Sequence, residues 1–509
     1  MSSQLLSPPL ISIIQKYNLD ISIVEIRNLW VWQRLDSDFY KPEHLAIERL
    51  TKNNHFCSFK DLDIRVDASA FYPSIEPRYN TGSLPFLRVA NVNLSVKYDE
   101  AVTIPEELPN EYVTIKVWQP WDIVITKWWS VARCGILDRK CALSRDLILV
   151  PSSHLSLVQQ KALFVYLITS TSNKLLLKTA SLTAQPHLTL KLIQEHPIFS
   201  PKWDFQGKIA DLFDEYTSQR ELSKSLYAEA EQVLLRELGL IDWTPTEVSI
   251  AEKMSEEVRF FGRCDAEFFQ PKYDELIEKI QSYRWWYDTL ENLISIVSKQ
   301  MKPDEEREYQ YCELADIDPS LGTVGEYTKI IWKDLPGRAR MKIEKWDVVV
   351  SSVAGSSSKV ALIESEDINL IASTGFFVLK PKAFNAETNL VLMKSIFMQL
   401  FLERSARGMI LSATNQDDFR NLPIPNISPD IQSLISSRII ASHSARGKSK
   451  TLLERAKRAV EIFIEEDEES AERFLELYIS IPIDSSPRVP WYDYQVMGES
   501  TRTSLVLWS

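Results

Sequence analysis

The chain has 509 residues, of which 45% are hydrophobic and 25% are charged, values typical of a globular protein. Single cores rarely grow beyond about 250–300 residues, so at least two domains are expected. The net charge of −12 argues against indiscriminate coating of nucleic acid, although local basic strips remain compatible with DNA binding. The sequence has no apolar run of about 20 residues and no start typical of a secretory signal, so we expect a cytoplasmic protein without membrane contact.

The cysteines give no sign of a metal site or a disulfide framework. Their number is odd and none forms a CxxC pair, which excludes zinc spacing and complete disulfide pairing. Free cysteine is usually buried, so each is expected to be a small core residue: Cys57, Cys134, Cys141, Cys264 and Cys312.

Four short motifs occur twice, in the same order. The pairs are 36–44 with 265–273, 121–126 with 346–351, 144–150 with 373–379, and 182–185 with 413–416. The first pair shares the pattern acid, small, acid, aromatic, aromatic, polar, proline. Because the separation stays within a few residues, the pairs indicate a duplicated unit with insertions in its loops.

The predicted elements follow the same order in each copy. A short helix follows the first motif, and apolar, β-branched runs then predict strands at 85–92, 121–126, 147–150, 347–352 and 375–379. Each copy closes with a long helix, about 207–238 with Gly239 as its C-terminal cap, and about 429–466. Their apolar stripes are narrow, so we expect the two helices to pack antiparallel as a coiled coil. The acidic run 465–469 is expected to be a solvated helix end.

These elements predict six segments. They are 1–30, an N-terminal segment; 31–206, a first β-rich module; 207–262, a long helix and linker; 263–428, a second module; 429–470, a second long helix; and 471–509, a tail. A helix of about 30 residues spans about 45 Å. Two modules held apart by such helices could therefore contact the two halves of a split DNA target at a fixed spacing.

The first copy resembles a target-recognition domain of a type I restriction–modification specificity subunit. The resemblance rests on Asp-x-acid-aromatic-aromatic-x-Pro, then 85–92 (PFLRVANV), 122–126 (DIVIT), 144–147 (SRDL) and 183–188 (TAQPHL). The second copy matches more loosely, and the resemblance covers roughly residues 30–465.

The resemblance implies an α+β fold with two pseudo-symmetric target-recognition domains, separated by a pair of long antiparallel coiled-coil helices. It implies a non-catalytic subunit, without cofactor or metal, whose two domains each read one half of a bipartite site in double-stranded DNA. The implied partners are two methyltransferase (modification) subunits, docked on the helices, and a nuclease-translocase (restriction) subunit.

The sequence departs from that family at four tryptophans. Trp121, Trp128, Trp129 and Trp346 stand where such proteins usually carry glycine, and the chain holds only 13 glycines against 14 tryptophans. Glycine permits a left-handed backbone that tryptophan adopts only at a cost. Either the loops have been rebuilt, or codons one base away from glycine codons have been read as tryptophan.

Candidate DNA-contacting residues of the first copy lie in loops beside the predicted strands. Lysine and arginine bind phosphate and guanine, and amides can read adenine. A basic cluster at 127–145 is the main candidate, with a solvated loop as the alternative. Gln185 could read adenine, and the alternative for its segment is helix capping around Thr189. For Arg88 and Asn91, which flank a strand, the alternative is structural hydrogen bonding. The candidates are Arg88, Asn91, Lys127, Ser130, Arg133, Arg145, Gln185 and His187, and the cluster also contains Arg139 and Lys140.

In the second copy a hydroxyl-rich loop occupies the corresponding position, and its alternative is a flexible turn. A second basic strip precedes it, formed by Arg338, Arg340, Lys342 and Lys345. The candidates here are Arg338, Arg340, Ser352, Ser356, Ser357, Lys359, Asn415 and Gln416. The pairs Trp128-Trp129 and Trp285-Trp286 could stack on bases, but buried packing is the expectation.

No catalytic motif supports an enzyme. The sequence lacks GxxxxGK[ST], HExxH, GxSxG, GxGxxG and an NPPF-type methyltransferase motif. The alternative function is a scaffold or interaction protein of a defence system that reuses the fold without reading DNA; an autonomous nuclease or methyltransferase is a third, less supported hypothesis.

Overall fold

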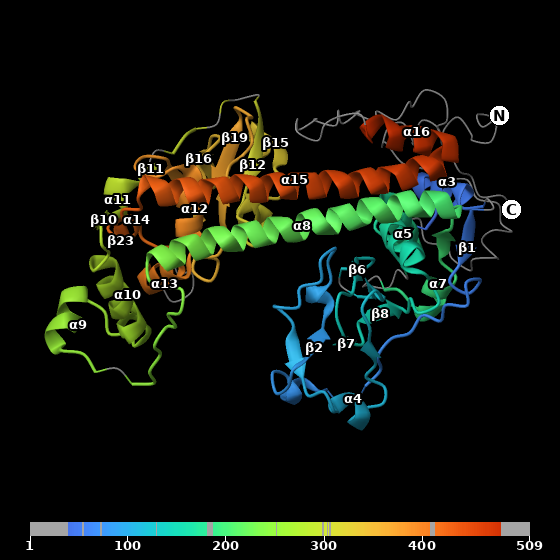
Figure 1. Cartoon of the computed structure of the whole chain (residues 1–509), viewed down its shortest axis with the longest axis horizontal. Helices are drawn as coiled ribbons and strands as arrows, with labels where there is room; N and C mark the ends of the chain where they lie inside the picture. Colours follow the sequence, from blue (N-terminus) through green and yellow to red (C-terminus); the bar gives the residue numbers. More distant parts are fainter. Residues whose placement is uncertain are drawn as a thin grey trace, which may run out of the picture. The chain divides into compact units, whose positions relative to one another are not determined.

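The computed structural model describes residues 39–52, 55–71, 74–128, 130–180, 187–250, 252–297, 300–302, 304, 307–407 and 413–479. The chain divides into two compact units, Met1–Thr217 with Lys448–Ser509, and Ser218–Gly447. Both boundaries fall inside the long helices α8 (Trp203–Glu237) and α15 (Pro429–Glu465) (Figure 1). Each unit therefore contains one part of each long helix.

The first unit contains two small sheets and a strand pair. One sheet has the order β3-β2-β7-β4, formed by β2 (Leu84–Leu87), β3 (Val102–Ile104), β4 (Val117–Trp118) and β7 (Cys141–Leu143). The other has the order β6-β5-β8, formed by β5 (Ile123–Thr126), β6 (Cys134–Ile136) and β8 (Leu147–Val150). The pair is β1 (Phe56–Ser58) with β9 (Pro197–Phe199). The shorter helices are α3 (Pro42–Leu50), α4 (Leu108–Glu111), α5 (Leu157–Leu167), α6 (Ser170–Thr179), α7 (Leu190–Gln194) and α16 (Glu468–Ile479).

The second unit repeats this plan. A four-stranded sheet has the order β15-β12-β19-β16, formed by β12 (Glu308–Cys312), β15 (Thr328–Ile331), β16 (Ala339–Lys342) and β19 (Leu370–Ser373). A six-stranded sheet has the order β11-β20-β17-β18-β14-β13, formed by β11 (Ser295–Val297), β13 (Ile317–Asp318), β14 (Thr323–Val324), β17 (Val348–Ser351), β18 (Val360–Leu362) and β20 (Phe376–Lys380).

Two strand pairs complete the second unit, β10 (Tyr287–Thr289) with β23 (Pro423–Pro425), and β21 (Ala406–Arg407) with β22 (Ala413–Thr414). Its shorter helices are α9 (Ser255–Phe261), α10 (Pro271–Gln281), α11 (Leu290–Leu293), α12 (Ala386–Lys394), α13 (Ile396–Ser405) and α14 (Gln416–Arg420).

The strand pairing confirms the internal repeat and the α+β class. β2 pairs in parallel with β7, and β12 pairs in parallel with β19, each inside a sheet whose outer strands run antiparallel. β5 lies between β6 and β8, as β17 lies between β18 and β20. The strand expected at 85–92 ends earlier than predicted, because a short 3-10 turn, Val89–Asn91, follows β2.

Local sequence explains most helix starts. Proline occupies the first turn of α3 and of α10, where its missing amide hydrogen costs nothing. Ser156 and Thr169 cap α5 and α6 by accepting hydrogen bonds from the amides of Gln159 and Ser172. Gly239, with φ of 64°, follows the end of α8 and confirms the predicted cap.

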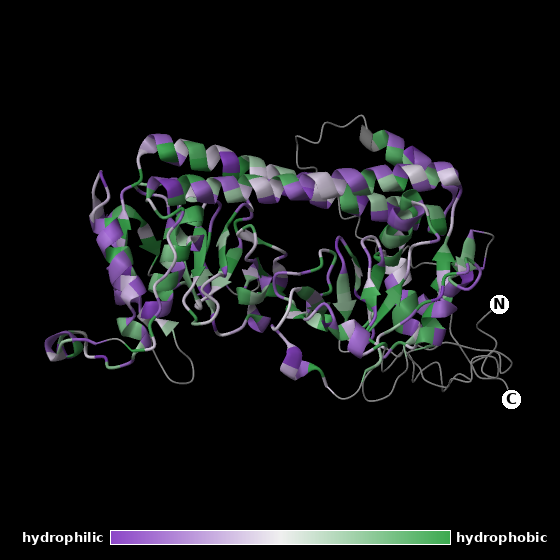
Figure 2. Cartoon of the chain, turned by 60° about the horizontal axis from the view of Figure 1, so that its bottom comes forward, coloured by the Kyte–Doolittle hydropathy of each residue, from purple (hydrophilic) through white to green (hydrophobic). Residues whose placement is uncertain are grey.

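The long helices pack antiparallel within each unit, which confirms the prediction. In the first unit Phe205 of α8 packs edge-on against Phe463 of α15, with ring centroids 4.9 Å apart, and the Ser449 hydroxyl donates to the Tyr216 carbonyl. In the second unit the Ser223 and Ser442 hydroxyls lie 3.2 Å apart, and Arg438 pairs with Glu229 at 3.2 Å. Hydrophobic and hydrophilic residues alternate along both helices (Figure 2), as expected for a seam with solvated flanks.

The segment from residue 471, expected to begin a tail, instead continues as helix to residue 479 in α16. Ala471 and Leu475 are buried in the core of the first unit. The acidic run before it is largely exposed between the two helices, as expected. The apolar residues of α16 recur at helical spacing and cover this core. The prediction missed this helix because serine and proline clusters follow it in the sequence.

Two expectations about burial were wrong. Cys134, Cys141 and Cys312 are buried as predicted, but Cys264 is exposed and Cys57 is only half-buried. Trp285 and Trp286 retain 59% and 48% of their surface instead of packing inside. No helix of the described ranges is long and apolar enough to cross a membrane.

Candidate nucleic-acid interface

One backbone position holds three loops together in each unit. In the first unit the Lys127 amide donates to the Asp146 carbonyl at 2.9 Å, and the Lys127 carbonyl accepts from the Leu188 amide at 3.2 Å. The loop after β5, the turn before β8 and the segment after α6 therefore meet at Lys127.

Ser352 has the same role in the second unit. Its amide donates to the Gly375 carbonyl at 2.9 Å, and its carbonyl accepts from the Thr414 amide at 2.8 Å. All of these segments except the turn around Gly375 contain sequence-predicted contacts, so in each unit the fold gathers residues that lie far apart in the chain. A rigid scaffold presenting variable loops is a common arrangement for binding sites.

The loop between β5 and β6 is held in one shape by Thr126. Its hydroxyl donates to the Ser130 carbonyl and accepts from the Arg133 amide at 2.9 Å. Ala132 is buried with a left-handed φ of 67°, and Arg133 beside it is exposed. The loop thus satisfies its polar backbone internally and directs the Arg133 side chain to solvent.

The first unit carries a basic patch, which we define as Arg88, Lys127, Arg133, Lys140 and Arg145. Arg88 and Arg145 flank Tyr79, whose ring lies 5.8 Å from the Arg88 guanidinium; burial raises the pKa of Tyr79, and the two arginines oppose that shift. Within the described residues none of the five patch cations has a carboxylate partner. Arg139, by contrast, pairs with Asp138 at 2.9 Å. Four of these cations lie on or beside the three joined loops and form a surface suited to phosphate: Arg88, Lys127, Arg133 and Arg145. Lys140 lies on the connection before β7.

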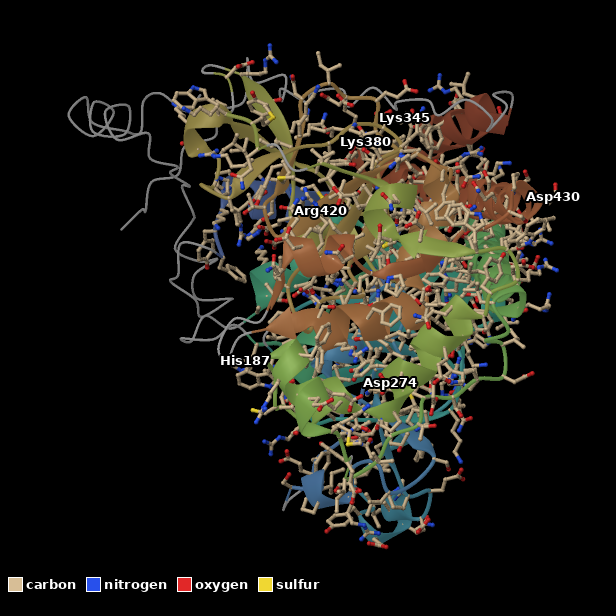
Figure 3. All side chains as sticks on the ribbon, turned by 90° about the vertical axis from the view of Figure 1, so that its left-hand side faces the viewer. His187, Asp274, Lys345, Lys380, Arg420 and Asp430 are labelled. Carbon is tan, nitrogen blue, oxygen red and sulfur yellow. The ribbon has the colours of Figure 1, made fainter. Side chains whose placement is uncertain are left out.

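The basic strip of the second unit, residues 338–345, is largely neutralised. Arg338 pairs with Glu313, Lys342 pairs with Glu344 at 2.7 Å, and Lys345 pairs with Glu366 at 2.6 Å. Lys345 is labelled in Figure 3, together with Lys380, which bridges Glu344 and Asp347. Hydrogen bonds from Lys342 and Lys380 lower the pKa of Glu344 to about 2.

Arg340 is the exception, because its guanidinium donates to a backbone carbonyl, that of Ala339, at 3.0 Å. Carboxylate partners therefore make the strip as a whole less attractive to phosphate than the basic patch.

The serine loop, residues 352–359 after β17, also uses much of its polarity internally. Ser352 donates to the Gly375 carbonyl at 3.0 Å, Ser356 lies 2.8 Å from the Ser351 hydroxyl, and Lys359 donates to the Ile317 carbonyl at 2.7 Å. Ser357 is half-buried and has no hydrogen bond to another described residue. Of the loop candidates, Ser357 is the one whose hydroxyl remains available.

Asn91 is an interior residue, which contradicts its selection as a DNA contact. It is 1% exposed, its side-chain oxygen accepts from the Arg88 amide at 2.9 Å, and its amide donates to the Lys97 carbonyl at 3.4 Å. Asp316 accepts from the Glu313 amide in the same way in the second unit. The repeated position therefore caps a turn. The same equivalence places Glu313 where the first unit has Arg88.

The remaining candidates lie around the segments after α6 and α13. Gln185 lies outside the described residues, and His187 stacks on Trp128, with centroids 4.7 Å apart and planes 10° apart. Trp129 is likewise outside the described residues. Asn415 caps α14 by accepting from the Asp417 amide at 3.2 Å, while Gln416 is half-buried with no side-chain partner in the described part of the chain. Thr189 caps α7, the alternative foreseen for this region.

The first repeated motif has a structural role that sequence reasoning missed. In the first unit Lys178, 4% exposed, pairs with Glu48, and its ammonium lies 4.5 Å from the Phe39 ring centroid. The cation sits in the last turn of α6, directly before a DNA-contact candidate segment. It ties that segment to the aromatic pair of the motif.

The second unit repeats the arrangement with Arg404 in the last turn of α13. Arg404 lies 4.6 Å from the Phe268 ring and 3.6 Å from Asp274, which Figure 3 labels on α10. The sequence signal for this contact was the pair of adjacent aromatic residues that recurs in both copies of the first motif. A cation held by a ring and a carboxylate fixes where each helix ends.

The second unit also contains a small pocket between its loops. It has a volume of about 120 Å³ and is lined by Ser351, Ser352, Val353, Ala354, Gly355, Ser357, Leu402, Glu403 and Thr414. The pocket joins the serine loop to the end of α13 and to β22, so it belongs to the same group of loops as Ser352.

Residues 66–232 match the family model of the type I restriction modification DNA specificity domain. Solved structures that match the chain include a type I restriction–modification system S subunit from M. genitalium, 12% identical, with a TM-score of 0.38 over 84% of this chain and 96% of that one. The HsdS subunit from Thermoanaerobacter tengcongensis is 11% identical, with a TM-score of 0.25 over 83% of this chain and 97% of that one. No curated protein matches the chain.

The TM-scores are below 0.5, so the family match alone carries the assignment. It covers the first copy from β2 to most of α8, including all five residues of the basic patch. Residues 66–232 are thus similar to the type I restriction modification DNA specificity domain, which confirms the resemblance seen in the sequence.

Proposed function

We propose that the chain is the non-catalytic sequence-specificity subunit of a type I restriction–modification complex. Each unit reads one half of a bipartite site in double-stranded DNA, and the long helices separate the two readers and dock methyltransferase subunits. A nuclease-translocase subunit joins that complex.

The basic patch on the joined loops of the first unit is the observation that carries this proposal. Lysine and arginine without internal carboxylate partners can exchange bound counterions for DNA phosphates. Because the Lys127 backbone fixes three loops together, base-reading side chains on those loops would keep a constant register along the duplex. The candidates retained for this unit are Arg88, Lys127, Ser130, Arg133, Arg145, Gln185 and His187.

The second unit suits a less electrostatic mode of contact. Its strip is paired with carboxylates, whereas the serine loop and the helix after it offer hydroxyl and amide groups. The retained candidates are Arg338, Arg340, Ser352, Ser356, Ser357, Lys359, Asn415 and Gln416, of which Ser357 and Gln416 have the freest side chains.

The test is DNA selection from a random library by the complex of this chain with its methyltransferase partner. We expect enrichment of a two-part sequence with a fixed gap, and no enrichment would refute sequence reading. Neutralising Lys127, Arg133 and Arg145 to glutamine should weaken binding. It should also reduce the slope of log affinity against log salt by about 0.9 for each DNA phosphate that the variant no longer binds.

The matched control neutralises three surface lysines of the same unit that already have carboxylate partners. These are Lys52, Lys97 and Lys174, paired with Glu48, Glu100 and Glu43. The control variant has the same net charge as the test variant but should keep the original salt slope. Equal slopes for both variants would count against the basic patch.

A scaffold without DNA recognition is the second candidate function. The neutralised strip of the second unit and the net charge of −12 favour it. The scaffold hypothesis predicts that the basic-patch variant binds DNA no differently from the unmodified chain.

A further inference from the structure

The pocket beside the serine loop contains one group that is unexpected on a DNA-facing surface. Glu403 is exposed, lines the pocket and has no ion-pair partner within the described residues. An unpaired carboxylate repels the phosphate backbone, so its presence there weakens nonspecific attraction.

The helix that carries Glu403 adds a second local cost. Glu403 lies in the last turn of α13, where the carbonyl ends of the helix give a partial negative charge. A carboxylate in that turn is destabilising, whereas the neighbouring Arg404 is favourable. Neither the helix nor the salt bridges of the unit therefore explain a glutamate at this position.

The equivalent position of the first unit shows that the fold does not require an acid here. Lys178 and Arg404 both occupy the next-to-last residue of their helices and both stack on the first aromatic of the repeated motif. The residues that precede them, Leu177 in the first unit and Glu403 in the second, therefore occupy equivalent positions. Leu177 is 45% exposed, so the side chain at this position projects to solvent in both.

The chemistry of the pocket suits the edge of a base. Its volume of about 120 Å³ is smaller than a typical small-molecule site of roughly 300–1,000 Å³, so it does not suit a cofactor. A carboxylate reads a base by accepting from an amino group, and cytosine N4 is the usual partner in the major groove. The Ser357 hydroxyl lines the same pocket and can donate or accept beside it.

We propose that Glu403 determines specificity in the half-site read by the second unit, by accepting a hydrogen bond from the amino group of a cytosine. This inference rests on the proposed function. The pairing compensates for the phosphate repulsion only when an amino group is present, so Glu403 rejects guanine and thymine. It disfavours adenine because a carboxylate cannot donate to the N7 acceptor beside the N6 amino group.

The experiment compares DNA selections by the methyltransferase complex of the full chain and of its Glu403→Gln variant. The original chain should enrich cytosine at one position of one half-site. The variant should lose that preference by roughly tenfold, because glutamine also donates and favours adenine, while the other half-site stays unchanged. Glu278→Gln is the control, since Glu278 is exposed on α10 of the same unit, outside the pocket.

The outcomes separate the inference from the proposed function. If the original chain enriches a bipartite site and Glu403→Gln enriches the same bases at every position, Glu403 does not read DNA, although the proposed function stands. If the original chain enriches no sequence, both are refuted. A change of preference at one position that also occurs in Glu278→Gln would assign the effect to net charge and overturn the inference.

Discussion

Trp121 and Trp346 occupy the same turn in the two repeats, and both have a left-handed backbone, with φ of 75° and 73°. Each donates its amide to a carbonyl across the following hairpin, that of Leu137 at 2.7 Å and that of Ile363 at 2.8 Å. The turn itself requires this conformation, which explains why glycine is expected there and what tryptophan costs.

Replacing Trp121 or Trp346 by glycine should give a more stable protein than replacing it by alanine. Both changes remove the indole ring, but only glycine relieves the left-handed backbone, which costs other residues about 1–2 kcal/mol. We expect a difference of about 1 kcal/mol in unfolding free energy, measured by denaturant titration. At Leu222, an exposed position inside α8, the order should reverse because alanine is the better helix former. Alanine equal to glycine at both tryptophan positions would contradict strain in the turn.

Lys178→Met should destabilise the first unit by roughly 3 kcal/mol. The change leaves Glu48, which has only 18% of its side chain exposed, without its buried partner, and it removes the cation over Phe39. Lys174→Met on the same helix is the control, because Lys174 is 43% exposed and its pair with Glu43 is worth at most about 1 kcal/mol. Similar decreases of unfolding free energy in the two variants would remove the special role given to Lys178.

Buried His196 should make the first unit sensitive to acid. Burial lowers its pKa to about 3, and its Nε2 lies 3.3 Å from the Ser172 hydroxyl. Above pH about 6.5 the imidazole is neutral in both the folded and unfolded states, so its full contribution to stability is present. Between pH of about 6.5 and about 3 only the unfolded state gains the proton, so stability falls as the pH is lowered through this window.

The variant His196→Gln should show a flatter dependence of the urea midpoint on pH, between about 7 and about 4, than the unmodified chain. His154 is exposed, and His154→Gln should retain the original slope. If both variants keep that slope, another group accounts for the acid sensitivity.

Cys264 should react first with a thiol reagent under native conditions. It is exposed, whereas burial raises the pKa of the Cys134, Cys141 and Cys312 thiols to about 12, which leaves almost no thiolate at neutral pH. Titration with a chromogenic disulfide should show a fast phase that Cys264→Ser removes. The three buried thiols should react only after unfolding, and their rapid reaction in the native protein would contradict the buried assignment.

The sequence by itself determined the features that depend on local patterns. Repeated motifs revealed the duplication, and apolar runs located β5, β8, β17 and β20. Narrow apolar stripes predicted that α8 and α15 pack against each other. Residue periodicity and turn chemistry act over a few positions, so they can be followed without knowing the fold. The strain at Trp121 and Trp346 was indicated instead by the family resemblance, since such proteins usually carry glycine at these positions.

Only the tertiary structure decided which polar groups are available. The Asn91 side chain is hydrogen-bonded within a turn, to the Arg88 amide and the Lys97 carbonyl. Arg338 pairs with Glu313, and Lys178 pairs with Glu48, which lies 130 residues away in the chain. The exposure of Trp285 and the pocket beside Glu403 likewise depend on which elements pack next to them. Whether a charge is paired or free is set by neighbours distant in sequence, and residue type and spacing carry no information about them.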